Sequence, residues 1–90
     1  MNYDLTNSWQ KLSDIMGSNY AVNIKYRIHS NVDGLQILAY ALTNTVTTGA
    51  KIPAYADIYV EPGNDIYLKI ISKRTEAYTY EDALYITEVA

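Results

Sequence analysis

Few side chains in this chain of 90 residues suit catalysis or metal binding. His29 is the only histidine, and the chain has no cysteine. One imidazole cannot build a multi-histidine metal site, so we expect His29 to be a partly exposed residue at the end of a strand. The serines have no G-x-S-x-G context and no second histidine to act as a base. The sequence therefore predicts no metal site and no activated nucleophile.

Acidic side chains gather around the Pro62-Gly63 pair, at Asp57, Glu61 and Asp65. In an extended strand Asp57 and Glu61 share a face but lie about 13 Å apart. Paired glycosidase acids are only about 5–9.5 Å apart. Glu61 and Asp65 could approach across a turn and hold a cation weakly, but solubilising charges beside a turn are the favoured interpretation. The glycines are scattered and form no phosphate-binding loop. We expect neither enzymatic activity nor a cofactor.

The composition is unusual in its aromatic residues, because ten are tyrosine and none is phenylalanine. Tyrosine combines an apolar ring with a polar tip, which suits surfaces that are half-buried or buried against a partner. Tyr55, Tyr59 and Tyr67 are expected on the strand faces opposite the Ile, Val and Leu side chains, and so to point outward. The candidate interface residues are Tyr40, Tyr55, Tyr59, Tyr67, Tyr78, Tyr80 and Tyr85.

Charge and length exclude several classes of function. Lys and Arg number 7 against 10 Asp and Glu, for a net charge of −3, which argues against nucleic-acid binding and against docking on anionic lipid. No apolar run approaches the roughly 20 residues that cross a bilayer, and the first residues do not resemble a signal peptide. We expect residues 1–90 to form one domain, near the lower size limit for a fold without disulfides. An oligomeric contact would help to stabilise it.

The clearest strand signal is the alternation of apolar and polar residues from Tyr20 to His29. A turn is expected at residues 31–34, where an Asp-Gly pair favours positive φ. The apolar stretch 35–42 fits a buried strand or a helix, and we favour a strand that pairs back on residues 20–29. Residues 43–50 are uncharged and rich in threonine, which favours an exposed loop or edge strand.

The remaining segments also read mainly as strands and turns. Residues 55–61 and 66–71 alternate, and Pro62-Gly63 between them predicts a type II turn. Residues 83–89 are expected to form a final strand with Leu84 and Ile86 inward. Residues 3–17 have helix-like apolar spacing but also fit a short strand and a turn. Together the segments predict an all-β fold, a small antiparallel sandwich or barrel of about five to seven strands, with a short N-terminal helix or turn.

Four segments carry a layout that can be compared with known families. They are Trp9-Gln10-Lys11-Leu12-Ser13, the strand around 20–29, Glu61-Pro62-Gly63-Asn64 before an alternating strand, and the closing strand 83–89. This layout resembles that of small phage structural proteins, which are head-decoration, head-fibre or tail-associated components with compact β folds. The resemblance spans most of the chain but not residues 35–50 or 72–82.

The resemblance implies a non-enzymatic virion component, made in the host cytoplasm. Such a protein would bind copies of itself, or the major capsid, portal or tail protein, and edge pairing through residues 43–50 would contribute. Two alternatives stay open. One is a small phage inhibitor whose acidic side chains occupy a basic site on a host defence protein. The other is a carbohydrate-binding module that uses the tyrosines and Trp9 as stacking platforms.

Overall fold

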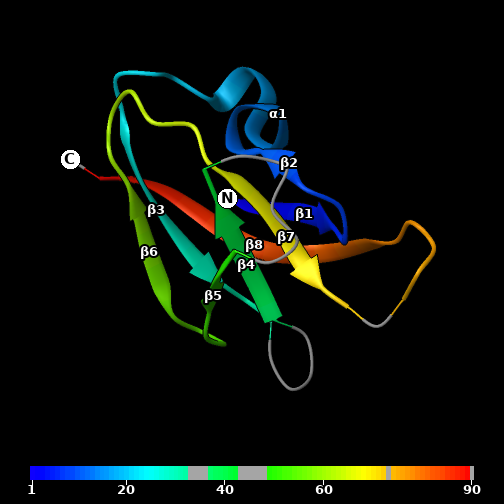
Figure 1. Cartoon of the computed structure of the whole chain (residues 1–90). Coiled ribbons are helices and arrows are strands. Elements are labelled where there is room, and N and C mark those ends of the chain that lie inside the picture. The colour runs from blue at the N-terminus through cyan, green and yellow to red at the C-terminus, as the bar shows by residue number, and fades with distance from the viewer. Residues whose placement is uncertain (33–36, 43–48, 73, 90) are drawn as a thin grey trace.

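The computed structural model describes residues 1–32, 37–42, 49–72 and 74–89, which form two antiparallel sheets (Figure 1). Sheet A has the order β1 (Asn2–Thr6), β8 (Thr79–Val89), β3 (Lys25–Ser30), β6 (Asp57–Val60). Sheet B has the order β2 (Gln10–Lys11), β7 (Tyr67–Ile71), β4 (Ile37–Ala41), β5 (Ala50–Ile52). Every paired neighbour runs antiparallel. The prediction of a small antiparallel all-β fold is confirmed.

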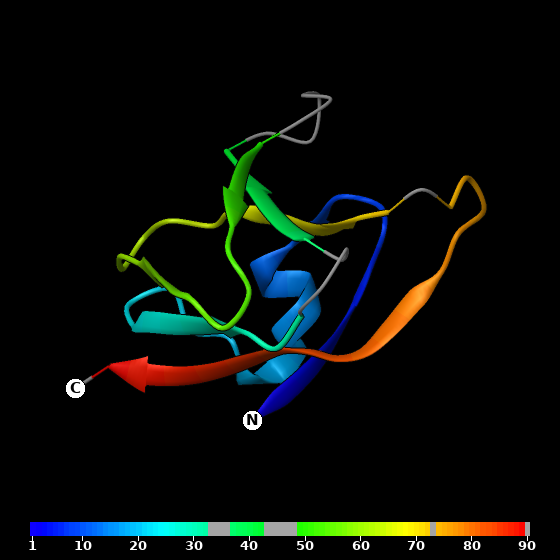
Figure 2. The same ribbon diagram turned by 90° about the horizontal axis from the view of Figure 1, so that it is seen from below.

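The two sheets enclose one hydrophobic core, with β3 and β8 in one layer and β4 and β7 in the other (Figure 2). Burial alternates along β3 and β7, because successive side chains of a strand point to opposite faces. Almost fully buried side chains come from both layers, namely Leu5, Tyr26, Ile28 and Leu84 of sheet A and Ile52, Leu68 and Ile70 of sheet B. The stability of each sheet therefore depends on the other.

The N-terminal segment contains both short strands and a short helix, the two alternatives that its sequence allowed. Residues 2–6 and 10–11 are strands, and α1 (Leu12–Met16) follows as a short helix. Leu12 and Met16 are one helical turn apart, and both are buried against the core. Gly17, with φ 58°, ends the helix in a conformation that glycine adopts without strain. The helix lies at one end of the molecule, next to β1 and β2 (Figure 1).

The strand expected over residues 20–29 is shorter in the structure. β3 begins at Lys25, because residues 21–24 form a turn in which the Ile24 N–H donates to the Ala21 carbonyl at 3.3 Å. That turn breaks the two-residue period, and Val22, which the alternation placed on the apolar face, is 63% exposed. The buried face of this strand thus starts at Tyr26.

The pairing expected for residues 35–42 is wrong. β4 is a strand as predicted, but it pairs with β5 and β7 in sheet B instead of with β3. Both sides of β3 are already taken by β6 and β8, so no edge remains for a hairpin partner. Residues 33–36 and 43–48, where we expected part of a turn and an adhesive edge, lie outside the described residues. Ala50 begins β5, which is the edge strand of sheet B.

The turn and strands of the second half follow the sequence pattern. The Asn64 N–H donates to the Glu61 carbonyl at 3.1 Å and Gly63 has φ 86°, which are the features of a type II turn. Leu84 and Ile86 point inward as predicted. β8 is longer than the predicted strand 83–89. It starts at Thr79, and its pairing with β1 shifts register between Tyr3 and Leu5.

Candidate functional site

The face of sheet A that points away from the core carries three of the candidate tyrosines. Tyr59 lies on β6 and is 55% exposed, and Tyr85 lies on β8 and is 39% exposed. Tyr55 precedes β6, is 58% exposed, and its ring centroid lies 6.4 Å from that of His29. We call this surface the sheet A outer face, and it consists of Lys25, Arg27, His29, Tyr55, Asp57, Tyr59, Glu61, Tyr85 and Thr87.

The strand register arranges these side chains in rows. Arg27 lies opposite Tyr59 on one side and opposite Thr87 on the other. Directly opposed residues of an antiparallel pair share a face, with their Cβ atoms about 4.5–5.5 Å apart. Lys25, Arg27 and His29 of β3 therefore form a central column between the side chains of β6 and β8.

Two of these three side chains have carboxylate partners on the same surface. Lys25 Nζ lies 3.2 Å from Glu61 Oε1, and 5.4 Å from the centre of the Tyr59 ring. His29 Nδ1 lies 2.6 Å from Asp57 Oδ1, and the two side chains are 30% and 34% exposed. His29 is thus the partly exposed residue that we expected near the end of a strand. Asp57 and Glu61, interpreted from the sequence as solubilising charges, are each paired.

Arg27 occupies the middle of the column. None of the ion pairs among the described residues includes it. Its Nε is buried and has no hydrogen-bond partner within the described part of the chain. The alternation of the sequence places Arg27 on the polar side of its strand but does not show which side chains lie beside it.

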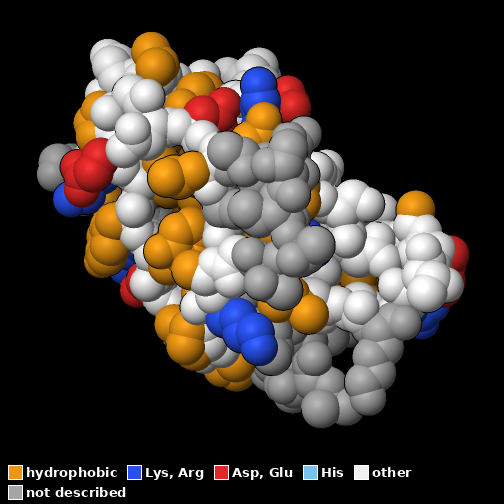
Figure 3. Space-filling view, in the orientation of Figure 1, with side chains coloured by type: hydrophobic (Ala, Val, Ile, Leu, Met, Phe, Trp, Pro, Cys, Tyr) orange, Lys and Arg blue, Asp and Glu red, His pale blue; other side chains and the backbone are white. Residues whose placement is uncertain are grey.

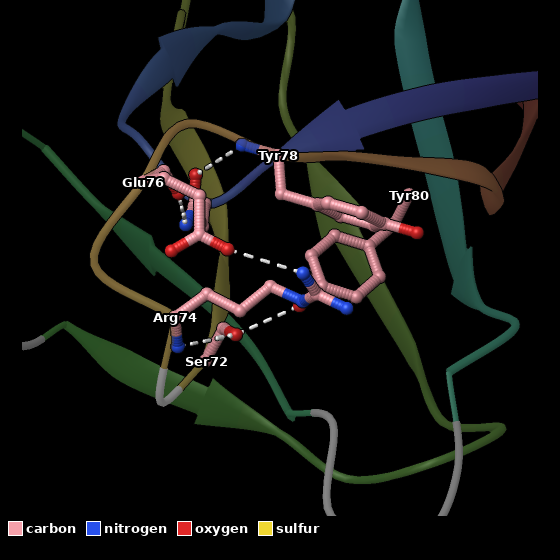
Figure 4. Close-up of polar contacts among 6 residues, drawn as sticks. Ser72, Arg74, Glu76, Tyr78 and Tyr80 are labelled. Atoms are coloured by element: carbon pink, nitrogen blue, oxygen red, sulfur yellow. Dashed lines mark hydrogen bonds and ion pairs between the residues drawn. The ribbon is translucent and has the colours of Figure 1, made fainter.

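Tyr78 and Tyr80 belong to a second cluster, at the loop that leads into β8 (Figure 4). The Arg74 guanidinium carbon lies 4.1 Å from the centre of the Tyr78 ring, and its Nη1 donates to Glu76 Oε1 at 3.1 Å. The two tyrosine rings meet edge to face at 4.8 Å. The Tyr80 hydroxyl donates to Ser72 Oγ at 2.7 Å. The polar groups of this cluster therefore bind mainly one another.

Backbone contacts fix the same loop to the start of the chain. Asn7 Nδ2 donates to the Glu76 carbonyl at 2.9 Å, and Asn7 Oδ1 accepts from the Tyr78 N–H at 3.1 Å. The backbone N–H of Glu76 first, and Arg74 second, lower the pKa of the Glu76 carboxyl. A polar pocket of about 370 Å³ lies beside the cluster, with Arg74, Tyr78 and Asp82 among its lining residues.

The other two candidate tyrosines lie in sheet B. Tyr40 on β4 is half-buried against the core, and Tyr67 on β7 is half-buried opposite Lys11. Tyr67 therefore does not share a surface with Tyr55 and Tyr59, because Tyr67 lies in sheet B and the other two lie on the sheet A outer face. The seven tyrosines are divided among three places, of which the sheet A outer face presents the most exposed rings.

Glu61 and Asp65, between which the sequence allowed a weak cation site, each have a different partner. Glu61 pairs with Lys25, while Asp65 accepts hydrogen bonds from Ser13, from its N–H at 3.2 Å and its Oγ at 2.6 Å. Within the described ranges, no three His, Cys, Asp or Glu side chains come together as metal ligands would. A search of the same residues finds no helix with the length and apolar character of a membrane span.

Comparisons with protein-family models, with curated proteins and with solved structures give no match for this chain. The likeness to small phage structural proteins therefore stays a prediction.

Proposed function

We propose that this chain is a non-enzymatic structural protein that binds other proteins through the sheet A outer face. The observation that carries the proposal is the exposure of the rings of Tyr55 and Tyr59, each more than half exposed, with Tyr55 near His29 and Tyr59 opposite the half-buried Arg27. Tyrosine and arginine are enriched among the residues that dominate the binding energy of protein interfaces. Figure 3 shows the opposite side of the molecule, where sheet B lies in front of sheet A.

The setting of these rings also favours binding. Tyr59 is held on a strand by the pairing of β6 with β3, and Lys25 lies against its ring. A tyrosine with two rotatable bonds on a fixed strand loses little conformational entropy when a partner covers it. The ion pairs of Lys25 and His29 hold the neighbouring side chains in place. The surface is therefore organised before a partner arrives.

In keeping with the resemblance of its sequence, the proposed setting is a phage virion. The chain would act there as a head-decoration, head-fibre or tail-associated protein that contacts itself or the major capsid, portal or tail protein. A net charge of −3, and the pairing of Lys25 and His29 with carboxylates on the sheet A outer face, favour a protein partner over nucleic acid.

The test is to locate the protein and to remove the exposed tyrosine rings of the sheet A outer face. Mass spectrometry of purified particles should detect the chain, and light scattering should detect its complex with itself or with a virion protein. The double variant Tyr55→Ala/Tyr59→Ala should lose that complex while it keeps its melting temperature within a few degrees. Tyr78→Ala, which removes an exposed tyrosine from the other cluster, is the matched control and should still assemble.

Several outcomes would refute the proposal. A chain that is absent from particles and stays monomeric beside purified capsid, portal and tail proteins is not a virion component. Complex formation with a host defence protein instead would favour an inhibitor. Binding on a glycan array that is lost in the double tyrosine variant would favour a carbohydrate-binding module.

A further inference from the structure

Arg27 differs from Lys25 and His29, its neighbours on the sheet A outer face, because it lacks a carboxylate partner. Lys25 and His29 lie two residues away on either side, and each has a carboxylate within ion-pair distance. The ion pairs among the described residues leave Arg27 without one. The guanidinium at the centre of this surface therefore has no carboxylate partner in the described part of the chain, whereas its two neighbours on β3 each have one.

The environment of the guanidinium makes this charge unusually ready to bind an anion. Its Nε is buried without a hydrogen-bond partner in the described part of the chain, so the group has lost part of its hydration. A buried donor that lacks a partner costs free energy, and its presence calls for an explanation. Arg27 as a whole is half-buried, with Tyr59 opposite it on β6 and Thr87 opposite it on β8, so part of the residue remains exposed to solvent.

We infer that Arg27 anchors a binding site for a carboxylate side chain in an acidic segment of a protein partner. This inference rests on the proposed function and names the chemistry of the partner. A guanidinium forms two parallel hydrogen bonds with a carboxylate, and an ionised pair is about twice as strong as a neutral hydrogen bond. The exposed phenol rings of Tyr59 and Tyr85 lie on the neighbouring strands, where they can contact the rest of the segment.

The charges around Arg27 favour a carboxylate over a phosphate group. Asp57 and Glu61 lie on the same surface, and their negative charges repel a dianion more strongly than a single carboxylate. One guanidinium without a carboxylate partner can pair with one carboxylate. A phosphate site normally gathers several unpaired cations or backbone N–H groups, and this surface offers one such cation.

The chain has two arginines, which supply an internal control. Arg74 already donates to Glu76, so its guanidinium is occupied. The experiment is an NMR titration of the full-length ¹⁵N-labelled protein with a synthetic hexaglutamate peptide, in which the Nε–H resonances of both arginines are followed. We expect a saturable shift of the Arg27 resonance and no comparable shift of Arg74.

Variants separate this site from general attraction of charge. Arg27→Gln should weaken peptide binding at least tenfold, as followed by the backbone amide of Tyr59, and Arg27→Lys should restore only part of it. Lys51→Gln removes an exposed cation of sheet B and should bind as the parent does. Because Arg27→Gln deletes an unpaired buried donor, its melting temperature should not fall, and lost binding would not reflect unfolding.

Three results would overturn the inference. They are equal shifts of Arg27 and Arg74, unchanged affinity in Arg27→Gln, and a larger response of Arg27 to inorganic phosphate than to the peptide. Particle assembly tests the proposed function separately. A protein that assembles through Tyr55 and Tyr59 but fails these titrations would refute the carboxylate site alone, whereas failure in both assays would refute both.

Discussion

At the scale of single residues, the hydroxyl group explains why tyrosine is used inside the fold as well as on its surface. Tyr26 is 1% exposed, yet its hydroxyl accepts the Ala21 N–H at 2.8 Å and donates to the Asn19 carbonyl at 3.3 Å. Phenylalanine would fill the same volume but leave those backbone groups without a partner. The abundance of tyrosine therefore reflects hydrogen bonding inside the fold as well as exposed rings outside it.

The first prediction concerns this buried hydroxyl. Tyr26→Phe keeps the ring and removes both hydrogen bonds, so the free energy of unfolding should fall by about 1–2 kcal/mol. Urea denaturation measures the change. The control is Tyr59→Phe, whose exposed hydroxyl should matter by less than about 0.5 kcal/mol. Equal losses in the two variants would contradict the proposed role of the Tyr26 hydroxyl.

A second prediction at this scale concerns the acid end of the pH range. Hydrogen bonds from its own backbone N–H and then from Arg74 stabilise the charged form of Glu76, so its pKa lies below the ordinary value. The resulting stability is present above the unfolded pKa of Glu76 and is lost as the pH falls through the folded pKa. NMR titration of the Glu76 carboxyl should show this low pKa.

Arg74→Gln supplies the comparison for that titration. Loss of the guanidinium should raise the pKa of Glu76 only part of the way back, because the backbone N–H contributes more. A pKa that reaches the ordinary glutamate value would mean that Arg74 alone holds it down. No change at all would mean that the ion pair does not form in solution.

At the scale of elements, the turn between β6 and β7 shows how a local sequence fixes a local structure. Gly63 has φ 86°, and a Cβ added there would meet no atom within 4 Å. The preference for glycine is thus a matter of backbone conformation alone. Gly63→Ala should lower the free energy of unfolding by about 1–2 kcal/mol, measured by chemical denaturation. Gly63→Asn should cost less, because asparagine tolerates positive φ, and the reverse order would contradict this explanation.

Strands and turns that depend on residues adjacent in the sequence could be predicted. The strands with which they pair could not. The alternation of residues 66–71 and the inward positions of Leu84 and Ile86 follow from the two-residue period of a strand. The placement of β4 in sheet B does not follow from that period, because an apolar stretch indicates burial without indicating which strand it pairs with. Contacts such as that of His29 with Asp57 depend on the register of β3 and β6, which are far apart in the sequence. The special position of Arg27 depends on the same register, so the sequence alone could not identify it.

At the scale of the whole molecule, β8 joins the two ends of the chain. It pairs with β1 on one side and with β3 on the other. The N-terminal amine of Met1 donates to the Ile86 carbonyl at 3.1 Å, and the Ile86 N–H donates to the Met1 carbonyl at 3.0 Å. Contacts of such long sequence separation form late and together, because loop closure must precede them. This arrangement favours cooperative unfolding of the two sheets.

Leu84→Ala tests that cooperativity. Leu84 on β8 is fully buried, and its truncation should lower the free energy of unfolding by about 2–5 kcal/mol. Because both sheets enclose one core, two probes should show the same displaced transition. One is the fluorescence of Trp9, whose ring is contacted by Lys69 of sheet B, and the other is the NMR signal of the Ile28 amide in sheet A. If the Ile28 transition moved while that of Trp9 stayed at its parent midpoint, the sheets would be separate cooperative units, and the shared core would contribute less than its burial indicates.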